Sequence, residues 1–192
     1  MPWEQSKAAK RRFNLGSFHN RYFVGEGLDI GGKPDPLGQY MDIFPKMGIV
    51  KVWDLEDGDA QYMKGIPDNY FDFVHSSHCL EHMEDPAVAF GNWIRIVKPG
   101  GHIITTVPDE DLYEMGRFPS KINPDHKWTM TIHKKNSWSP KSVNIARMLQ
   151  SFDDRIKIIK IELIEDFYRA HLIEKQIDQT GTPVAECSIE FI

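Results

Sequence analysis

Three histidines, one cysteine and one glutamate lie within the eight-residue segment HSSHCLEH, at positions 75–82. Inside this segment His78, Glu81 and His82 form the pattern H-x-x-E-H. Imidazole nitrogens and carboxylate oxygens are ligands of divalent metal ions, so this spacing could describe a metal site. The same residues could equally begin an ordinary helix. The elements around the segment decide between the two interpretations.

The hydrophobic pattern predicts strands that alternate with helices. An apolar stripe at i, i+3, i+4 and i+7 predicts a helix over 86–97, and Ser139 as N-cap with Pro140 at the first helical position predicts another over 139–152. The expected strands are 24–30, 48–54, 70–77, 102–108, 156–164 and 184–192. This alternation predicts an α/β protein with a doubly wound, mostly parallel sheet, in which ligands bind beyond the carboxyl ends of the strands.

Four segments in order resemble the motifs of the class I S-adenosylmethionine-dependent methyltransferases, close to the type 11 group. They are GLDIGG, VWDLEDGDA, FDFVHSSHCLEHMEDP and RIVKPGGHIITTVPD, and the resemblance covers about residues 21–110. It implies a Rossmann-like fold with an antiparallel last strand, methyl transfer as the activity, and S-adenosylmethionine as the cofactor, with S-adenosylhomocysteine as product. H-x-x-E-H also occurs in inverted zinc metalloproteases, but its place after a sheet strand within these motifs disfavours a protease.

The resemblance places the cofactor along the carboxyl ends of the first three strands. Asp29 would hold the amino end of the cofactor, while Gly31 and Gly32 let the backbone approach it closely. Asp54 would accept hydrogen bonds from both ribose hydroxyls, and Asp59 would accept one from the adenine amino group. Neighbouring residues complete the expected cofactor set: Ile30, Leu55, Ala60 and His75.

Two features depart from the pattern of this family. The last glycine of the usual D-x-G-x-G turn is replaced by Lys33, which leaves the start of the first helix uncertain. Only 55–58 separate Asp54 from Asp59, where the family usually has a helix and a further strand, so the sequence predicts a sheet trimmed to about six strands. The adenine side would then be more open, and either Asp54 or Glu56 could meet the ribose.

A second segment favours the metal interpretation. NPDHKWT, at 123–129, follows the next strand, and the pair of segments resembles the small-RNA 3′-terminal 2′-O-methyltransferases, which hold a divalent ion by E-x-x-E-H and a later histidine. Carried over, this implies Glu81, His82 and His126 as ligands, with His78 in place of the family's first glutamate. At i and i+4, His78 and His82 are expected on one helix face, and the set suits manganese, zinc or iron better than magnesium.

The segment 107–139 is too long for a simple connection between a strand and a helix. We expect it to form an acceptor-binding insertion above the methyl-transfer site, within a single domain spanning residues 1–192. His78, His126 and Tyr113 are the candidate catalytic groups. Further candidate contacts to the acceptor are Glu114, Arg117 and Asn123.

The composition narrows the partners. The chain is 41% hydrophobic and 27% charged, with a net charge of −5, as in a globular protein. No apolar run approaches about 18 residues and no apolar core follows the first basic residues, so neither a membrane span nor a secretory signal is expected. Basic residues cluster only in KAAKRR, at 7–12, which argues against nucleic acid as a partner. Two cysteines form no disulfide framework, and a cytoplasmic location is expected.

These features predict a metal-assisted O-methyltransferase for a small-molecule acceptor, either a sugar or a phosphorylated compound, because a metal ion lowers the pKa of a hydroxyl that it binds. The whole run also resembles bacterial methyltransferases of surface-glycan pathways, which implies a role in methyl phosphoramidate decoration of a capsular polysaccharide. Two alternatives stay open. One is a metal-free methyltransferase with a histidine general base, and the other is a cofactor-binding scaffold without turnover.

Overall fold

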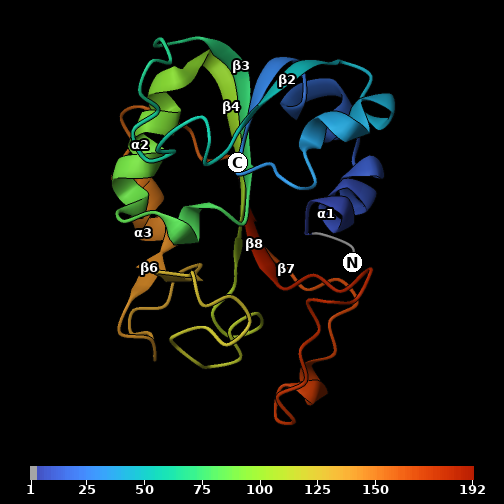
Figure 1. Ribbon diagram of the computed structural model, residues 1–192, viewed down its shortest axis with the longest axis vertical. Helices are drawn as coiled ribbons and strands as arrows, with labels where there is room; N and C mark the ends of the chain where they lie inside the picture. The colour runs from blue at the N-terminus through green and yellow to red at the C-terminus, as the bar shows by residue number, and fades with distance from the viewer. Residues whose placement is uncertain (1–3) are drawn as a thin grey trace.

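A six-stranded sheet runs through the middle of the molecule, with helices on both faces (Figure 1). This computed structural model describes residues 4–192. The strands, in spatial order, are β2 (Met47–Trp53), β1 (Gly25–Ile30), β3 (Phe71–Ser77), β4 (Val97–Pro108), β8 (Ser188–Phe191) and β7 (Ile161–Ile164). The first four are parallel, and β8 runs antiparallel to both β4 and β7. The predicted six-stranded, mostly parallel Rossmann-like sheet with antiparallel closing strands is confirmed.

The trimmed edge of the sheet lies at β2. Between Trp53 and Phe71 the chain makes only turns, so this segment adds no helix or strand to the sheet, and β2 is its edge strand. Leu55, in the first of these turns, is 93% exposed. The chain beside β2 is thus exposed to solvent at Leu55, and the more open adenine side stays a prediction.

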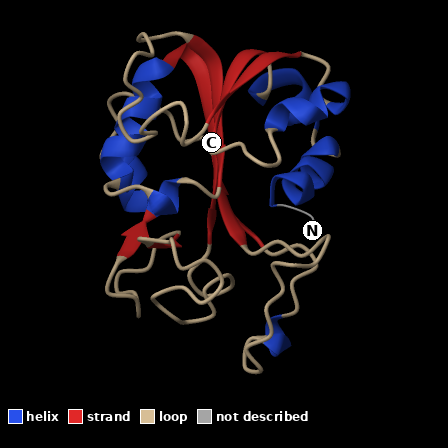
Figure 2. Ribbon diagram, in the orientation of Figure 1, coloured by secondary structure: helices blue, strands red, loops and turns tan. Residues whose placement is uncertain are grey.

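Helices cover the sheet on both faces, and Figure 2 shows them separated by it. The longest, α2 (Pro86–Ile96), begins with Pro86 at a position that needs no backbone donor, and the Asp85 side chain caps the amides of Ala87 and Val88. The apolar side of α2 buries Trp93 completely against the sheet. The other helical elements are α1 (Glu4–Phe13), the π-helix η1 (Phe18–Tyr22), the 3₁₀ helices η2 (Leu37–Ile43), η3 (Leu80–His82) and η4 (Ala170–Leu172), and α3 (Ile145–Gln150).

The predicted helix over 139–152 is wrong in its first half. Residues 142–144 form the strand β6 (Ser142–Asn144), which pairs in parallel with β5 (Thr129–Thr131). The helix α3 starts only at Ile145, where the Asn144 side chain accepts a hydrogen bond from the Arg147 amide. Pairing with a distant strand has overridden the local N-cap signal at Ser139.

Two long segments emerge at one end of the sheet, below it in Figures 1 and 2. The first follows β4 and runs through β5 to β6. It is held at its root by Glu110, whose buried carboxylate accepts hydrogen bonds from four side chains: Thr129, Lys134, Ser137 and Ser142. The second links β7 to β8. Both segments therefore lie at the end of the sheet where β3 and β4 finish, close to the polar clusters.

Candidate functional site

The H-x-x-E-H segment begins where β3 ends. His78 has a left-handed backbone, with φ of 53°, while its amide still donates to the Thr106 carbonyl of β4 at 2.9 Å. The helix that follows, η3, is a single 3₁₀ turn that starts at Leu80. The expectation that His78 and His82 share a helix face is therefore wrong, because the chain turns away from β3 at His78 before any helix forms.

The second predicted segment meets the first through the backbone. The amides of Lys127 and Trp128 both donate to the carbonyl of Glu81, at 3.0 and 3.2 Å. This brings His126 Nε2 to 3.6 Å from Glu81 Oε1, and His82 Nε2 lies 3.9 Å from the same oxygen. One ligand atom from each of Glu81, His82 and His126 lies within 4.8 Å of the other two.

Hydrogen bonds fix how both histidines face this centre. His82 Nδ1 lies 3.1 Å from the Asp125 carbonyl oxygen, and His126 Nδ1 lies 2.6 Å from Glu114 Oε1. Each Nδ1 must carry the proton, since a carbonyl and a carboxylate only accept. The Nε2 lone pairs are then free to face Glu81. Outer partners of this kind orient histidine ligands in metal sites.

The carboxylate of Glu81 is the exceptional group of the centre. It is fully buried, and neither of its oxygens has a hydrogen-bond partner within the described residues, 4–192. Burial raises the pKa of Glu81, and the nearby His126 and His82 only partly oppose this effect. A buried carboxylate without partners is costly, so Glu81 fits a site that a cation fills.

His78 stands beside this centre and outside the group of three. Its Nε2 lies 3.0 Å from the Ser188 hydroxyl, and its Nδ1 lies 3.7 Å from Glu81 Oε1. Burial lowers the pKa of His78 to about 3, so the imidazole is neutral. The ring of Tyr113 stacks on His126 at 5.4 Å and lies 5.6 Å from His78. Burial raises the pKa of Tyr113, which keeps its hydroxyl protonated.

Two cavities adjoin the centre and share Gly31, Lys33, His78 and His126 in their linings. The larger, of about 960 Å³, lies along the trimmed edge. Of the predicted cofactor residues, it is lined by Gly31, Asp54, Leu55, Asp59 and Ala60. The smaller, of about 280 Å³, lies between α1 and the glycine turn. Of the predicted cofactor residues, it is lined by Asp29, Gly31, Gly32 and His75. Ile30 is buried within the sheet and lines neither cavity.

Asp54 and Glu56 differ in a way that bears on the ribose. Asp54 lines the larger cavity, and its carboxylate accepts from the Lys33 amide at 3.0 Å and from the Leu55 amide at 2.9 Å. Glu56 is exposed, does not line that cavity and pairs with the Lys33 ammonium. Lys33, the departure from the glycine pattern, thus supports Asp54 through its backbone, and the geometry favours Asp54 over Glu56.

Asp29 is less available than expected. Its side chain is almost fully buried, and Oδ1 accepts from His75 Nδ1 at 2.6 Å while Oδ2 accepts from the Leu37 amide at 2.7 Å. Burial lowers the pKa of His75, in spite of the Asp29 carboxylate. The role of Asp29 at the cofactor stays a prediction.

The fold and the cavities at the ends of its strands define a class. The architecture is that of the class I methyltransferases, and a methyltransferase from Archaeoglobus fulgidus superposes with a TM-score of 0.61 at 17% identity, over 98% of this chain and 94% of that one. An S-adenosylmethionine-dependent methyltransferase from Aquifex aeolicus gives 0.52 at 12% identity, over 98% and 88%. A chain from the complex of the Haloferax volcanii Trm112 methyltransferase activator with a proposed methyltransferase gives 0.54 at 14%, over 100% and 97%.

A family profile described as a methyltransferase domain matches residues 41–105, which include Asp54, Glu81 and His82. No curated protein sequence matches the chain. The fold is that of the class I S-adenosylmethionine-dependent methyltransferases, and the profile match lies within it, over about a third of the chain. Within residues 4–192, no helix has both the length and the apolar character needed to span a bilayer. The expected cytoplasmic location stays a prediction.

The sequence predictions missed three features of the site. Glu114 orients His126, a role that the sequence did not predict, and its expected contact with the acceptor stays a prediction. Gln5 and Asp35 line the smaller cavity but belong to no predicted motif. Only the pairing of His126 with a nearby acid could have been anticipated, because metal-binding histidines usually have such partners.

Proposed function

We propose that this methyltransferase transfers a methyl group to an oxygen of a small acceptor and uses a divalent ion held by Glu81, His82 and His126. The observation that supports this most is the buried Glu81 carboxylate, which has no hydrogen-bond partner and faces two imidazole nitrogens. Two nitrogens and one carboxylate suit zinc, manganese or iron, and three protein ligands leave positions for an acceptor.

The chain's own residues would perform most of the alignment that methyl transfer requires. When bound, S-adenosylmethionine supplies a methyl group on a sulfonium, which oxygen displaces in line. Glu114 and the Asp125 carbonyl hold the two imidazoles in place. Tyr113, stacked on His126, would limit the access of water to that side of the imidazole. At this centre a divalent ion would screen negative charge on the acceptor and lower the pKa of an acceptor hydroxyl.

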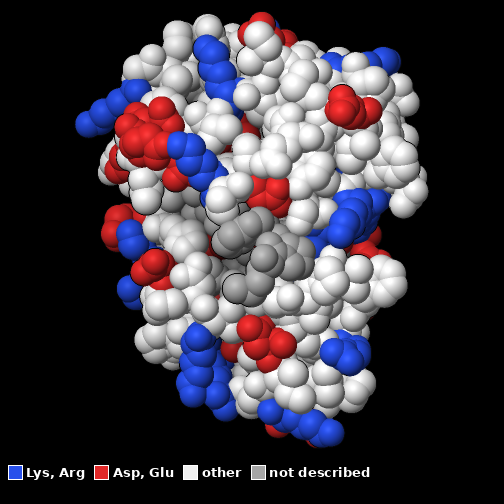
Figure 3. Space-filling view, turned by 45° about the vertical axis from the view of Figure 1, so that its right-hand side comes forward, with Lys and Arg blue, Asp and Glu red and all other residues white. Residues whose placement is uncertain are grey.

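The insertion 107–139 is proposed as the acceptor-binding segment. It contributes Tyr113, Glu114 and His126 to the site, and Arg117 lies in the same segment. On the face drawn in Figure 3, basic and acidic side chains are interspersed and no broad basic surface is visible. A small sugar or phosphorylated acceptor suits this surface better than an RNA does. Such an acceptor would agree with the resemblance of the sequence to methyltransferases of surface-polysaccharide pathways.

Metal uptake is the direct test. Calorimetry with Mn²⁺ and Zn²⁺ on untagged protein should give one site in the wild type and none in His82→Ala or His126→Ala, while S-adenosylhomocysteine binding is kept in both. His171→Ala, which alters an exposed histidine of η4, is the matched control and should bind metal normally. Metal binding that survives in both site variants would refute the proposal. The Haloferax volcanii chain is found with an activator protein, so turnover of this chain could depend on a partner. The test therefore measures metal and cofactor binding, which require neither a partner nor an acceptor.

The metal-free alternative has its own observation. Glu114 and His126 form a carboxylate–imidazole pair at 2.6 Å, the arrangement of an oriented general base. Burial lowers the pKa of His126, but the Glu114 hydrogen bond and the Glu81 and Glu114 charges outweigh it and leave the pKa raised. Full turnover of a phosphorylated-sugar panel in excess chelator would favour this mechanism. Cofactor binding with no turnover in either condition would favour the scaffold.

Asp54 tests the cofactor assignment separately. Asp54→Asn should weaken S-adenosylhomocysteine binding by about 1.5–3 kcal/mol, because charge-assisted hydrogen bonds to the ribose would be lost. Glu56→Gln should leave the affinity unchanged. The reverse result in calorimetry would assign the ribose to Glu56.

A further inference from the structure

The smaller cavity contains polar atoms that the fold does not satisfy. Gln5 and Asp35 are 5% and 8% exposed, and both line this cavity of about 280 Å³. Among residues 4–192, no hydrogen-bond partner is found for the buried atoms Gln5 Nε2 and Asp35 Oδ2, nor for the hydroxyl of Ser77, which lines the same cavity. Buried polar atoms are rarely left unpaired, so these three atoms indicate a ligand.

The orientation of Gln5 follows from its neighbour. Arg12 Nη1 donates to Gln5 Oε1 at 3.3 Å. A guanidinium has only donors, so the amide oxygen must face Arg12 and the amide NH₂ must face the other way. Arg12 is itself fully buried and held by Glu190 and by the Thr106 hydroxyl. Gln5 therefore holds an unpaired amide NH₂ in a fixed position at the wall of the cavity.

Asp35 presents the complementary group. Its Oδ1 accepts from the Tyr40 hydroxyl at 2.7 Å, which fixes the carboxylate, and Oδ2 is left free. A carboxylate oxygen only accepts, so it suits an ammonium. By contrast, both oxygens of Asp29 are already occupied, by His75 and by the Leu37 amide.

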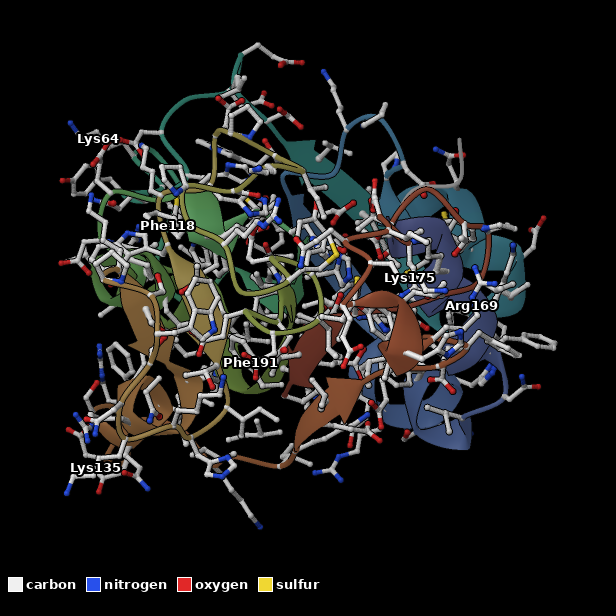
Figure 4. The ribbon with its side chains drawn as sticks, turned by 90° about the horizontal axis from the view of Figure 1, so that it is seen from below. Lys64, Phe118, Lys135, Arg169, Lys175 and Phe191 are labelled. Carbon is white, nitrogen blue, oxygen red and sulfur yellow. The ribbon has the colours of Figure 1, made fainter. Side chains whose placement is uncertain are left out.

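The wall that carries Gln5 is firmly attached. Lys7, two residues further along α1, donates to the Thr180 carbonyl at 2.7 Å, and Arg11 pairs with Glu186 at 3.0 Å. In Figure 4, Arg169 and Lys175 mark this β7–β8 segment on the side of α1, whereas Phe118 marks the insertion on the other side. The donor at Gln5 is thus positioned before any ligand arrives.

We propose that Gln5 and Asp35 bind the amino-acid end of S-adenosylmethionine. Gln5 Nε2 donates to the α-carboxylate, and Asp35 Oδ2 accepts from the α-ammonium, with the Ser77 hydroxyl as a third contact. Arg12 and Tyr40 are positioning residues. The inference rests on the cofactor that the family implies, and it needs neither the metal ion nor the acceptor. Asp29 would then shape the subsite through His75 and η2 and would not bind the ammonium directly.

The test uses ligands that each lack one charge. Calorimetry compares S-adenosylhomocysteine with its 3-aminopropyl thioadenosine analogue, which lacks the carboxylate, and its 3-carboxypropyl thioadenosine analogue, which lacks the ammonium. Gln5→Glu keeps an oxygen for Arg12 but turns an acceptor toward the cavity. Asp35→Asn keeps an oxygen for Tyr40 but removes the charge. Lys10→Ala, an exposed change on the same helix, is the control.

A crossed pattern is expected. Gln5→Glu should weaken S-adenosylhomocysteine and the carboxypropyl analogue about 10- to 100-fold, the usual effect of losing a hydrogen bond to a charged group, and should bind the aminopropyl analogue at least as well as wild type. Asp35→Asn should weaken S-adenosylhomocysteine and the aminopropyl analogue by a similar factor and leave the carboxypropyl analogue unchanged. Lys10→Ala should match the wild type throughout.

The outcomes separate this inference from the proposed function. Equal losses for all three ligands, or no loss for any, overturn the Gln5–Asp35 subsite even if Mn²⁺ binds at Glu81. If both His82→Ala and His126→Ala still bind Mn²⁺, the metal proposal is overturned even if the crossed pattern is found. A wild type that binds none of the three ligands overturns the subsite as well.

Discussion

Glu190 and Glu81 are both completely buried, yet their surroundings are opposite. Glu190, on β8, accepts from Arg12 at 2.8 Å and from Arg11 and Lys160 at 3.0 Å each. Burial alone would raise its pKa, but Arg12 and Arg11 outweigh that effect and hold the pKa of Glu190 well below its usual range. Among residues 4–192, no group donates a hydrogen bond to the Glu81 carboxylate, and burial raises its pKa.

The difference separates a carboxylate that builds the fold from one that we propose binds a metal ion. Glu190 joins α1 to the sheet through two arginines, so its partners are supplied by the chain itself. Glu81 lies just after the carboxyl end of β3, where sheets of this kind bind ligands. Its neighbours are the imidazoles of His82 and His126, which carry no permanent positive charge. Burial by itself therefore says little about function, whereas burial without a partner points to a site.

The largest effect should follow from breaking the satisfied cluster. Glu190→Gln leaves the guanidinium of Arg12 buried without its carboxylate, which should lower the free energy of unfolding by about 3–5 kcal/mol. Urea unfolding measures this. Glu162→Gln is the control, because Glu162 pairs with the same Lys160 but at the surface. A loss at Glu190 no larger than the loss at Glu162 would contradict the structural role.

A buried carboxylate whose hydrogen bonds come from backbone amides should have an effect on the free energy of unfolding between those of Glu190 and Glu81. The carboxylate of Asp109, at the start of the insertion, accepts from the amides of Asp111 and Leu112, and burial raises its pKa from 3.8 to about 6. Because the pKa of Asp109 is higher in the folded than in the unfolded state, Asp109 stabilises the fold fully below about pH 4. This stabilisation is lost as the pH rises through about 6. Relative to Asp109→Asn, the wild type should lose at most about 3 kcal/mol of unfolding free energy between pH 4 and pH 7.5.

That difference is measured by urea unfolding of both proteins across the pH range, since titrations elsewhere cancel in the comparison. A wild type and Asp109→Asn with parallel pH profiles would mean that Asp109 is solvated or paired in solution.

The unsatisfied cluster should respond with the opposite sign. In excess chelator, Glu81→Met removes a buried carboxylate that has no partner, so the variant should be more stable than wild type by about 1–3 kcal/mol. Added Mn²⁺ should raise the thermal midpoint of the wild type and leave that of Glu81→Met unchanged. Glu84→Gln, an exposed neighbour, should behave as wild type. A destabilised Glu81→Met in chelator would show that Glu81 has structural partners in solution.

The sequence predicted the fold better than the site because strands leave local signals. Apolar runs that stop at glycine or polar clusters located the four parallel strands, and the short link from Asp54 to Asp59 predicted the trimmed edge. The errors came from long-range pairing. Residues 142–144 join β5 instead of a helix, and the left-handed backbone of His78 ends the continuity between β3 and η3.

The site depended still more on distant contacts. Resemblance alone suggested that His126 meets Glu81, 45 residues earlier, and the structure places them together. Nothing local indicated that Gln5 reaches the cavity, because its position is set by the bond from Arg12 to Glu190, 178 residues away. A lone glutamine on a helix has no signature until the elements that surround it are in place.

The smallest effect should come from an exposed charged pair beside the larger cavity. The side chains of Lys33 and Glu56 pair while more than half exposed, at 55% and 57%. Water and salt screen such a pair, so a double-mutant cycle of Lys33→Ala and Glu56→Gln should give a coupling below about 0.5 kcal/mol. Lys33→Ala should also keep the support of Asp54, because that hydrogen bond comes from the Lys33 backbone amide. Urea unfolding measures the coupling, and a value above 1 kcal/mol at 0.15 M salt would show that charge pairs at this edge depend on more than exposure.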